Sequence, residues 1–373
     1  MSQPNEIKIV NKRVIVVLGM HRSGTSAITR GLQVLGVLLG DRLLPPANGE
    51  NDKGYWEDFD IYSLNNEMLN AINKDWHCIA SIRQRELETL KQNGYLDRAI
   101  ELIRQKTYNV SIFGIKDPII PMLLPFWKEV FIQCQYDVSY VLAVRNPLSI
   151  AKSLAKRNGF DIEMSYLLWL NHVINSLSGT IGCNRIIVDY DKLMQDAEKE
   201  LNRIAAALHL TMDTAELEIY KTEFLDNTLR HFVYELNDLL QDEAASAMVR
   251  EVYKTVMDLS FTLQIDDEVL QEKAYKWKNE LVLLNPALTL ADKLFNQLKA
   301  SEQSMNVRDA TINSLNKQLL NQEQLTIQKT EEIVKGKETL NLVYSSKSWR
   351  MTKLLRIVSD FLHKKVRKGV YIN

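Results

Sequence analysis

The chain has 373 residues, of which 46 are Lys or Arg and 47 are Asp or Glu, giving a net charge of −1. Its 46% hydrophobic and 25% charged content is typical of folded globular proteins and excludes disordered, collagen-like and disulfide-stapled chains. The balanced charge gives no general attraction to nucleic acid, so we expect no nucleic-acid partner.

The cysteines and the N-terminal region bear on the compartment. Cys78, Cys134 and Cys183 are scattered without a CxxC spacing, which argues against a thiolate metal site and favours a reducing compartment. The apolar run Val14–Leu18 is too short for a signal-peptide core, and the chain has no run of about 18 apolar residues. We therefore expect a cytoplasmic protein with no membrane-spanning segment.

The first 212 residues alternate short apolar runs with helical patterns. Four runs rich in β-branched residues predict buried strands: Val14–Leu18, Ile112–Ile115, Val138–Val144 and Arg185–Val188. Helical patterns cover Thr25–Leu35, Asp60–Ile72, Arg83–Lys106, Pro118–Cys134, Pro147–Arg157, Met164–Leu177 and Asp196–Leu208. Because crossovers through helices make neighbouring strands parallel, the pattern predicts an α/β fold, a parallel β-sheet with helices on both faces.

Beyond residue 212 the strand signals end. We expect a core at 1–212, a helical continuation at 213–287, a long helix or coiled coil at 288–345 and a basic amphipathic tail at 346–373. Every seventh residue from Ala291 to Leu340 is apolar except Thr326, whereas the row three residues on is mixed. This partial heptad predicts a long helix that either joins two protomers or packs one stripe on its own domain.

The tail differs in charge from the rest of the chain. Asn341–Asn373 has eight Lys or Arg residues and a single Asp, a net charge of 8 − 1 = +7. Apolar residues, among them Trp349 and Phe361, interleave with these charges. The pattern predicts a basic helix that lies at an anionic membrane surface such as the inner membrane, binds an acidic partner, or is a solvated capping helix.

The segment Gly19–Ser26 carries the strongest chemical signal. It follows the first predicted strand and precedes the first helix, and two glycines five positions apart let the backbone wrap an anion at a helix N-terminus. The GxxxxG spacing is that of a nucleotide-triphosphate loop, but Thr25 stands where that motif needs Lys. Arg22 supplies the cation instead, and its planar fork suits a phosphate or sulfonate.

A second segment, Val144–Ser153, follows another predicted strand. Asn146 and Pro147 are residues that open a helix, and Arg145 can bend along its first turns toward Ser153. A guanidinium and a hydroxyl could then share one phosphate.

With these two segments the chain resembles the PAPS-dependent sulfotransferases, in particular those of bacterial type. PAPS is 3′-phosphoadenosine 5′-phosphosulfate. The resemblance spans about residues 13–210 and implies a P-loop-like fold, here with a C-terminal helical extension. It implies that Arg145 and Ser153 bind the 3′-phosphate and that the loop binds the 5′-phosphate through Arg22, Ser23, Gly24, Thr25 and Ser26.

Two shorter matches add residues. Lys116-Asp117-Pro118 is similar to the family's Lys-Asp-Pro, whose Lys reaches the bridging oxygen of the donor. The strand that ends at Tyr190 resembles the family's strand ending in Tyr-Glu-Asp-Leu, which places Tyr190 near the nucleotide. Asp191 and Lys192 replace the usual Glu-Asp pair, so Tyr190 is interpreted as mainly structural.

The base that accepts the acceptor's proton is assigned from Gly54-Tyr-Trp-Glu57, which resembles a segment that supplies a Glu base in bacterial members. Glu57 is the first choice. Glu50, Asp58 and His21 are alternatives, and Glu57 could instead cap the following helix.

The resemblance implies a sulfotransferase that moves a sulfonate group from PAPS to a hydroxyl of a glycan or lipid-linked glycan, without a metal. Glu57 would deprotonate the acceptor, while Lys116 and Arg22 neutralise charge on the transferring and leaving groups. The alternatives are a P-loop kinase-like phosphotransferase and a non-catalytic coiled-coil scaffold in surface-polysaccharide assembly.

Overall fold

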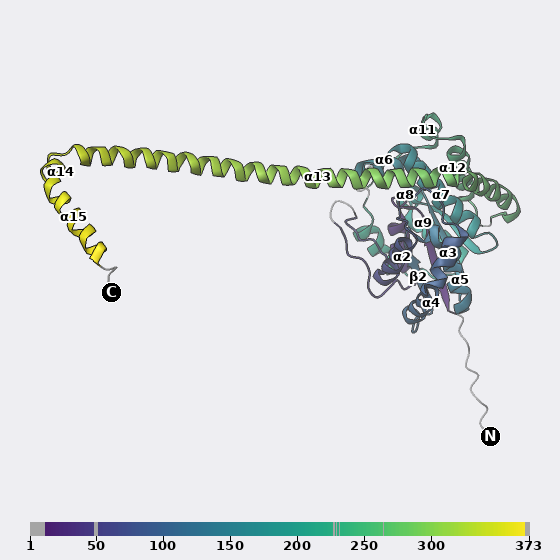
Figure 1. The fold of residues 1–373 in the computed structure, drawn as a ribbon. Coiled ribbons are helices and arrows are strands. Elements are labelled where there is room, and N and C mark those ends of the chain that lie inside the picture. The colour runs from purple at the N-terminus through teal and green to yellow at the C-terminus, as the bar shows by residue number, and fades with distance from the viewer. Residues whose placement is uncertain are drawn as a thin grey trace, which may run out of the picture. The chain divides into compact units, whose positions relative to one another are not determined.

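The computed structural model describes residues 12–47, 51–226, 228, 230, 232–263 and 265–369, with side chains as far as Lys364. The chain divides into two compact units, Met1–Lys293 and Leu294–Asn373 (Figure 1). The candidate base Glu50 lies outside the described residues.

A four-stranded parallel sheet forms the centre of the first unit. Its strands are β1 (Arg13–Leu18), β2 (Ile112–Lys116), β3 (Asp137–Val144) and β4 (Asn184–Asp189), in the order β2-β1-β3-β4. In register, Val16 of β1 pairs with Ile115 of β2 and Tyr140 of β3. The four predicted strands and the α/β fold class are confirmed.

Helices connect the strands, as crossovers between parallel strands require. They are α1 (Thr25–Val34), α2 (Phe59–Ala71), α3 (Gln84–Gln92), α4 (Tyr95–Lys106), α5 (Ile120–Cys134), α6 (Pro147–Asn158), α7 (Ile162–Gly179), α8 (Tyr190–Gln195) and α9 (Ala197–Leu208). The prediction of one helix over Arg83–Lys106 is wrong. Gly94 adopts a left-handed φ of 78°, which breaks the pattern into α3 and α4.

Successive side chains of each strand point to opposite faces of the sheet, and helices cover both faces. On one face, Ile15 and Val17 of β1 are buried in a cluster with residues of α1, α8 and α9, including Leu201. On the other face, Val14 and Val16 are equally buried, α7 contacts β3, and α5 packs against α7. The carboxyl ends of the strands stay open, and this is where ligands of such sheets bind.

The region after residue 212 is helical, as predicted. It contains α10 (Thr214–Ile219), a π-helical turn η1 (Tyr220–Phe224), α11 (Leu236–Gln241), α12 (Ala247–Leu259) and α13 (Asp267–Ser345). The long helix α13 begins at Asp267, earlier than the predicted position 288, and passes through Pro286 without ending. Its first turns belong to the first unit because Trp277 and Leu281 are buried there and Asp292 accepts hydrogen bonds from the backbone N–H groups of Ile79 and Ala80.

The second unit comprises the rest of α13 from Leu294, a short α14 (Lys347–Met351) and α15 (Lys353–Gly369). From Asn296 to Ser345 every residue of α13 is exposed, including the apolar row Leu298, Met305, Ile312, Leu319, Ile333 and Leu340. The predicted long helix is therefore present. Among the described residues, no helix combines the length and apolar character needed to cross a membrane.

Candidate functional site

The loop between β1 and α1 forms a tight turn. Arg22 and Gly24 both have left-handed φ values, 68° and 81°, and the Ser23 N–H donates to the Met20 carbonyl at 3.2 Å. Gly24 is the N-cap of α1. A Cβ on Gly24 would lie 2.0 Å from the Tyr190 ring, so only glycine fits there. The first N–H groups of α1 have no acceptor within the helix and are therefore available to an anion.

Arg22 and Ser153, far apart in sequence, meet at this loop. The Arg22 Nε donates to Ser153 Oγ at 2.8 Å. Ser153 lies in α6, whose start is fixed by the Asn146 side chain accepting from the Leu148 N–H, with Pro147 in the first turn. The structure thus brings the two predicted phosphate-binding segments into contact.

Arg145, at the end of β3, is buried beside them. It donates to the backbone carbonyls of Arg22 at 3.1 Å and Phe232 at 2.6 Å, and its guanidinium lies 4.8 Å from the centre of the Tyr190 ring. Its Nε makes no hydrogen bond within the described residues, although an oxygen of Asp191 lies 4.0 Å away. Burial lowers the pKa of Arg145. A buried cation with an unused donor is suited to an incoming anion.

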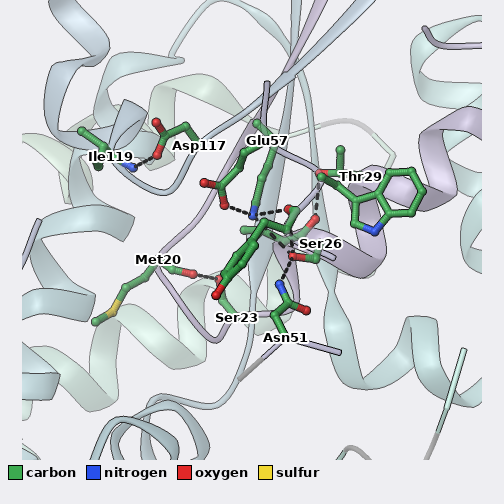
Figure 2. Close-up of polar contacts among 12 residues, drawn as sticks. Met20, Ser23, Ser26, Thr29, Asn51, Glu57, Asp117 and Ile119 are labelled. Atoms are coloured by element: carbon green, nitrogen blue, oxygen red, sulfur yellow. Dashed lines mark hydrogen bonds and ion pairs between the residues drawn. The ribbon is translucent and has the colours of Figure 1, made fainter. Parts of the chain in front are cut away.

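Lys116, the last residue of β2, contacts three residues, of which Glu57 and Ser26 are labelled in Figure 2. Its Nζ lies 2.5 Å from Glu57 Oε1, 2.9 Å from the Tyr55 carbonyl and 3.4 Å from Ser26 Oγ. Ser26 also accepts a hydrogen bond from the Asn51 amide at 3.2 Å. Lys116 and Glu57 are both about 4% exposed. A strand-end lysine, a carboxylate and the first turn of α1 therefore form one buried polar cluster.

These residues line one cavity of about 290 Å³. Of the predicted site residues it contains Arg22, Gly24, Thr25, Ser26, Glu57, Lys116, Arg145, Ser153 and Tyr190. Ser23 does not line it. Its hydroxyl turns inward to the Met20 carbonyl, so its side chain stabilises the loop and only its backbone remains for a ligand.

The charges around this cavity favour a ligand with several anionic groups. Six basic residues line it, namely Arg22, Lys53, Lys116, Arg145, Lys156 and Arg157, against the three carboxylates Asp52, Glu57 and Asp226. Sequence reasoning missed three of the basic residues. For two of them a signal existed: Lys156 and Arg157 follow Ser153 by three and four positions on α6, so they share its helix face.

The alternative bases fall in different places. Asp58 is not in the cavity: it caps α2 and lies 2.9 Å from Lys106, so that alternative is wrong on position. His21 lines the cavity, and its Nε2 has no hydrogen-bond partner within the described residues. Burial, followed by the positive charge of Arg157, lowers the pKa of His21. His21 is therefore neutral near pH 7, and the same burial and positive charge make it a weak proton acceptor.

The carboxylates at the strand ends do not face the cavity. Asp117 accepts hydrogen bonds from the Asn65 amide and the Ile119 N–H, and burial, then the nearby Glu57, raises its pKa. Asp189 caps α8 through the Asp191 N–H. Neither lines the cavity, so neither is placed to hold a magnesium ion on a nucleoside triphosphate there.

A second cavity of about 1030 Å³, bordered by α2 and α4, has the opposite charge. Five carboxylates line it, Asp41, Asp60, Glu67, Asp97 and Glu101, with only Arg98 and Lys106 as basic residues. Asp41, Asp58 and Asp60 approach one another as a metal site would require, but Lys106 pairs with all three. This acidic groove contains no predicted site residue and disfavours an anionic ligand.

No protein-family profile matches the chain, and a search of curated proteins finds no match. The chain is similar to the solved sulfotransferase domain of the Synechococcus PCC 7002 olefin synthase, with 17% identity and a TM-score of 0.37 over 73% of this chain and 98% of that one. It is also similar to the sulfotransferase domain of the curacin biosynthetic pathway, with 13% identity and a TM-score of 0.35 over 70% and 97% of the two chains.

Proposed function

We propose that this protein is a PAPS-dependent sulfotransferase. The observation that carries the proposal is the convergence of the Gly19–Ser26 loop, the Arg22–Ser153 contact, Arg145 and Lys116 on one cavity with twice as many basic residues as carboxylates. A bisphosphate nucleotide with a sulfonate has three anionic groups, which matches three separate sources of positive potential: the N-terminus of α1, the arginine pair and Lys116.

The anionic groups of the nucleotide are proposed to bind at separate parts of the cavity. Arg145 and the Arg22–Ser153 pair bind the 3′-phosphate, because Arg145 donates to the Arg22 carbonyl and the Arg22 Nε donates to Ser153 Oγ. The Arg145 Nε, which makes no hydrogen bond within the described residues, adds a donor. The N–H groups after Gly24 bind the 5′-phosphosulfate. Tyr190 and Phe224 line the same cavity, and we propose that their aromatic rings contact the purine.

Transfer requires one proton acceptor and one cation at the leaving oxygen. The acceptor hydroxyl attacks sulfur, its proton passes to the Glu57 carboxylate, and the bond between sulfur and the 5′-phosphate oxygen breaks. Lys116 stabilises the charge that develops on that oxygen. The short Lys116–Glu57 ion pair holds both groups in position before the substrates bind, and Lys116 already lies 3.4 Å from Ser26 at the loop. The product is the sulfated acceptor with 3′,5′-bisphosphoadenosine (PAP).

The acceptor is proposed to be a hydroxyl of a glycan or lipid-linked glycan on the cytoplasmic side of the membrane. Trp76 supports a sugar acceptor, because it is half-buried beside the cavity residue His21, with ring centroids 4.4 Å apart, and has the Arg157 guanidinium over its ring. Aromatic rings of this kind stack on sugars. A kinase-like reaction is less well supported because neither strand-end Asp lines the cavity and the loop lysine is absent.

Sulfur-labelled PAPS incubated with the protein and cell-envelope fractions tests this function. Label should enter a glycan or glycolipid fraction, and Glu57→Gln protein should leave it in the donor. If ATP labelled on its γ-phosphate transfers instead and PAPS does not, the kinase-like alternative replaces the proposal.

A further inference from the structure

The last helix of the second unit has two chemically distinct faces. In α15, five apolar side chains recur every third or fourth position and so share one face: Leu354, Leu355, Val358, Phe361 and Leu362. The opposite face carries Lys353, Arg356, His363 and Lys364 with the single acidic residue Asp360. Such a division is expected only where one side of the helix contacts an apolar medium.

Nothing in the described part of the chain covers the apolar face. Leu354 is 76% exposed, Phe361 67% and Val358 55%. Monomeric soluble proteins rarely expose a continuous apolar stripe of large side chains, since each exposed group forgoes the gain from burial. The exposed stripe therefore indicates a contact surface.

A packed corner separates α15 from the long helix. Ser346 caps α14 by accepting from the Trp349 N–H, and the Arg356 guanidinium lies 3.4 Å from the centre of the Trp349 ring. Tyr344 packs edge-on against Trp349 at 5.2 Å, and Arg356 also donates to Thr352 Oγ1 at 2.7 Å. These contacts stabilise the corner between α13, α14 and α15. The α14–α15 segment is therefore separate from the apolar row at every seventh position of α13.

We propose that α14 and α15 form a membrane-contact segment that lies in the interface of an anionic phospholipid bilayer. The apolar face enters the acyl boundary, and the lysines and arginines contact lipid phosphates. Charge complementarity carries the choice of a bilayer: Asn341–Asn373 has a net charge of +7, whereas an anionic leaflet is a continuous negative surface that requires no matched pockets. No described helix can cross a membrane, so the segment lies on the surface.

Vesicle flotation with the full chain tests the proposal. The vesicles contain phosphatidylcholine with either roughly one-third phosphatidylglycerol or none, since each basic residue near an anionic surface contributes about fivefold in affinity. We expect binding to the anionic vesicles at least about tenfold tighter than to neutral ones, weakening by a similar factor between about 50 and 300 mM salt. The assay does not depend on the nucleotide cavity, so it stands or falls separately from the proposed function.

Two pairs of variants separate the faces. Phe361→Asp should reduce binding about tenfold or more, while Ile327→Asp, at a position 60% exposed on α13, should not. Lys353→Glu should likewise weaken binding, and Lys317→Glu on α13 should leave it unchanged. Equal binding to neutral and anionic vesicles, absence of binding at low salt, or parental binding by Phe361→Asp would overturn the proposal. If binding is absent at low salt, the remaining explanation of the basic charge is an acidic protein partner.

Discussion

The region around the nucleotide cavity and the long helix α13 differ in how their side chains are packed. Around the cavity, Arg145 and Lys116 are buried and bind residues far away in the sequence, Arg145 the Arg22 carbonyl and Lys116 the Glu57 carboxylate. From Asn296 to Ser345, every side chain of α13 is exposed. Isolated helices gain little stability from propensity alone. The first region is stabilised by its own packing, whereas this stretch of α13 has no such packing within the described residues.

The largest expected effect concerns catalysis in the packed region. Glu57→Gln keeps the size of the side chain but removes the proton acceptor, so turnover should fall roughly 10² to 10⁴-fold while PAP affinity stays near parental. Steady-state sulfonate transfer and a binding titration measure the two quantities. Glu200→Gln is the matched control, because Glu200 is also buried and paired with an arginine, Arg203, but lies outside the cavity. Full turnover by Glu57→Gln would transfer the role to His21.

A smaller effect is expected on nucleotide affinity. Arg145→Ala removes a charge-assisted contact to the 3′-phosphate and should weaken PAP binding by about 2 to 4 kcal/mol. Calorimetry on the purified variants measures this. Arg203→Ala removes a largely buried arginine outside the cavity and should leave the affinity unchanged. Equal affinities of Arg145→Ala and the parent protein for PAP would remove Arg145 from the binding site.

The stability of the packed region should also depend on pH, because His172 is buried there. Burial lowers the pKa of His172 to about 4. Between pH 6.5 and that value the unfolded chain binds a proton that the folded chain does not, so stability is present at neutral pH and is lost as pH falls through this window. This group alone should cost up to about 3 kcal/mol by pH 4. Urea unfolding at several pH values should show a shallower loss for His172→Leu, and an identical pH slope in both proteins would contradict the assignment.

The smallest expected effect concerns association of the chain through α13, and it tests the difference between the two regions directly. If the apolar row on α13 contacts a second copy, the full chain should have about twice the monomer mass in light scattering, and a chain ending at Lys293 should be monomeric. The truncated chain should still bind PAP, because the cavity lies in the first unit. A monomeric full chain would mean that the row is solvated or covered by another protein.

The fold was largely predictable where local and long-range signals agree. The strands were found because runs such as Val14–Leu18 are β-branched and bounded by turn residues. The break between α3 and α4 was missed because helical periodicity continues through Asn93 and Gly94, and only the left-handed φ of Gly94 ends it. The early start of α13 was missed because its buried residues, such as Trp277, pack on elements distant in sequence.

The site was predictable to the extent that its motifs lie at strand ends. Lys116 ends β2, and Arg22 and Arg145 follow the adjacent parallel strands β1 and β3, whose carboxyl ends share one edge of the sheet. The ion pair between Glu57 and Lys116, and the contribution of the Tyr55 carbonyl, could not be read from spacing because they depend on how residues 51–57 fold back over α1. The inward turn of the Ser23 hydroxyl likewise depends on the loop's own geometry.

The most direct measurement of the central claim is a calorimetric titration of the full chain with PAP and, separately, with ATP and magnesium. The three basic elements of the cavity predict PAP binding with a Kd of about 1 μM or tighter, corresponding to about −8 kcal/mol, in the presence of a metal chelator. ATP with magnesium should bind far more weakly, since no strand-end carboxylate lines the cavity. Tight binding of ATP that depends on magnesium, with no heat from PAP, would contradict the account.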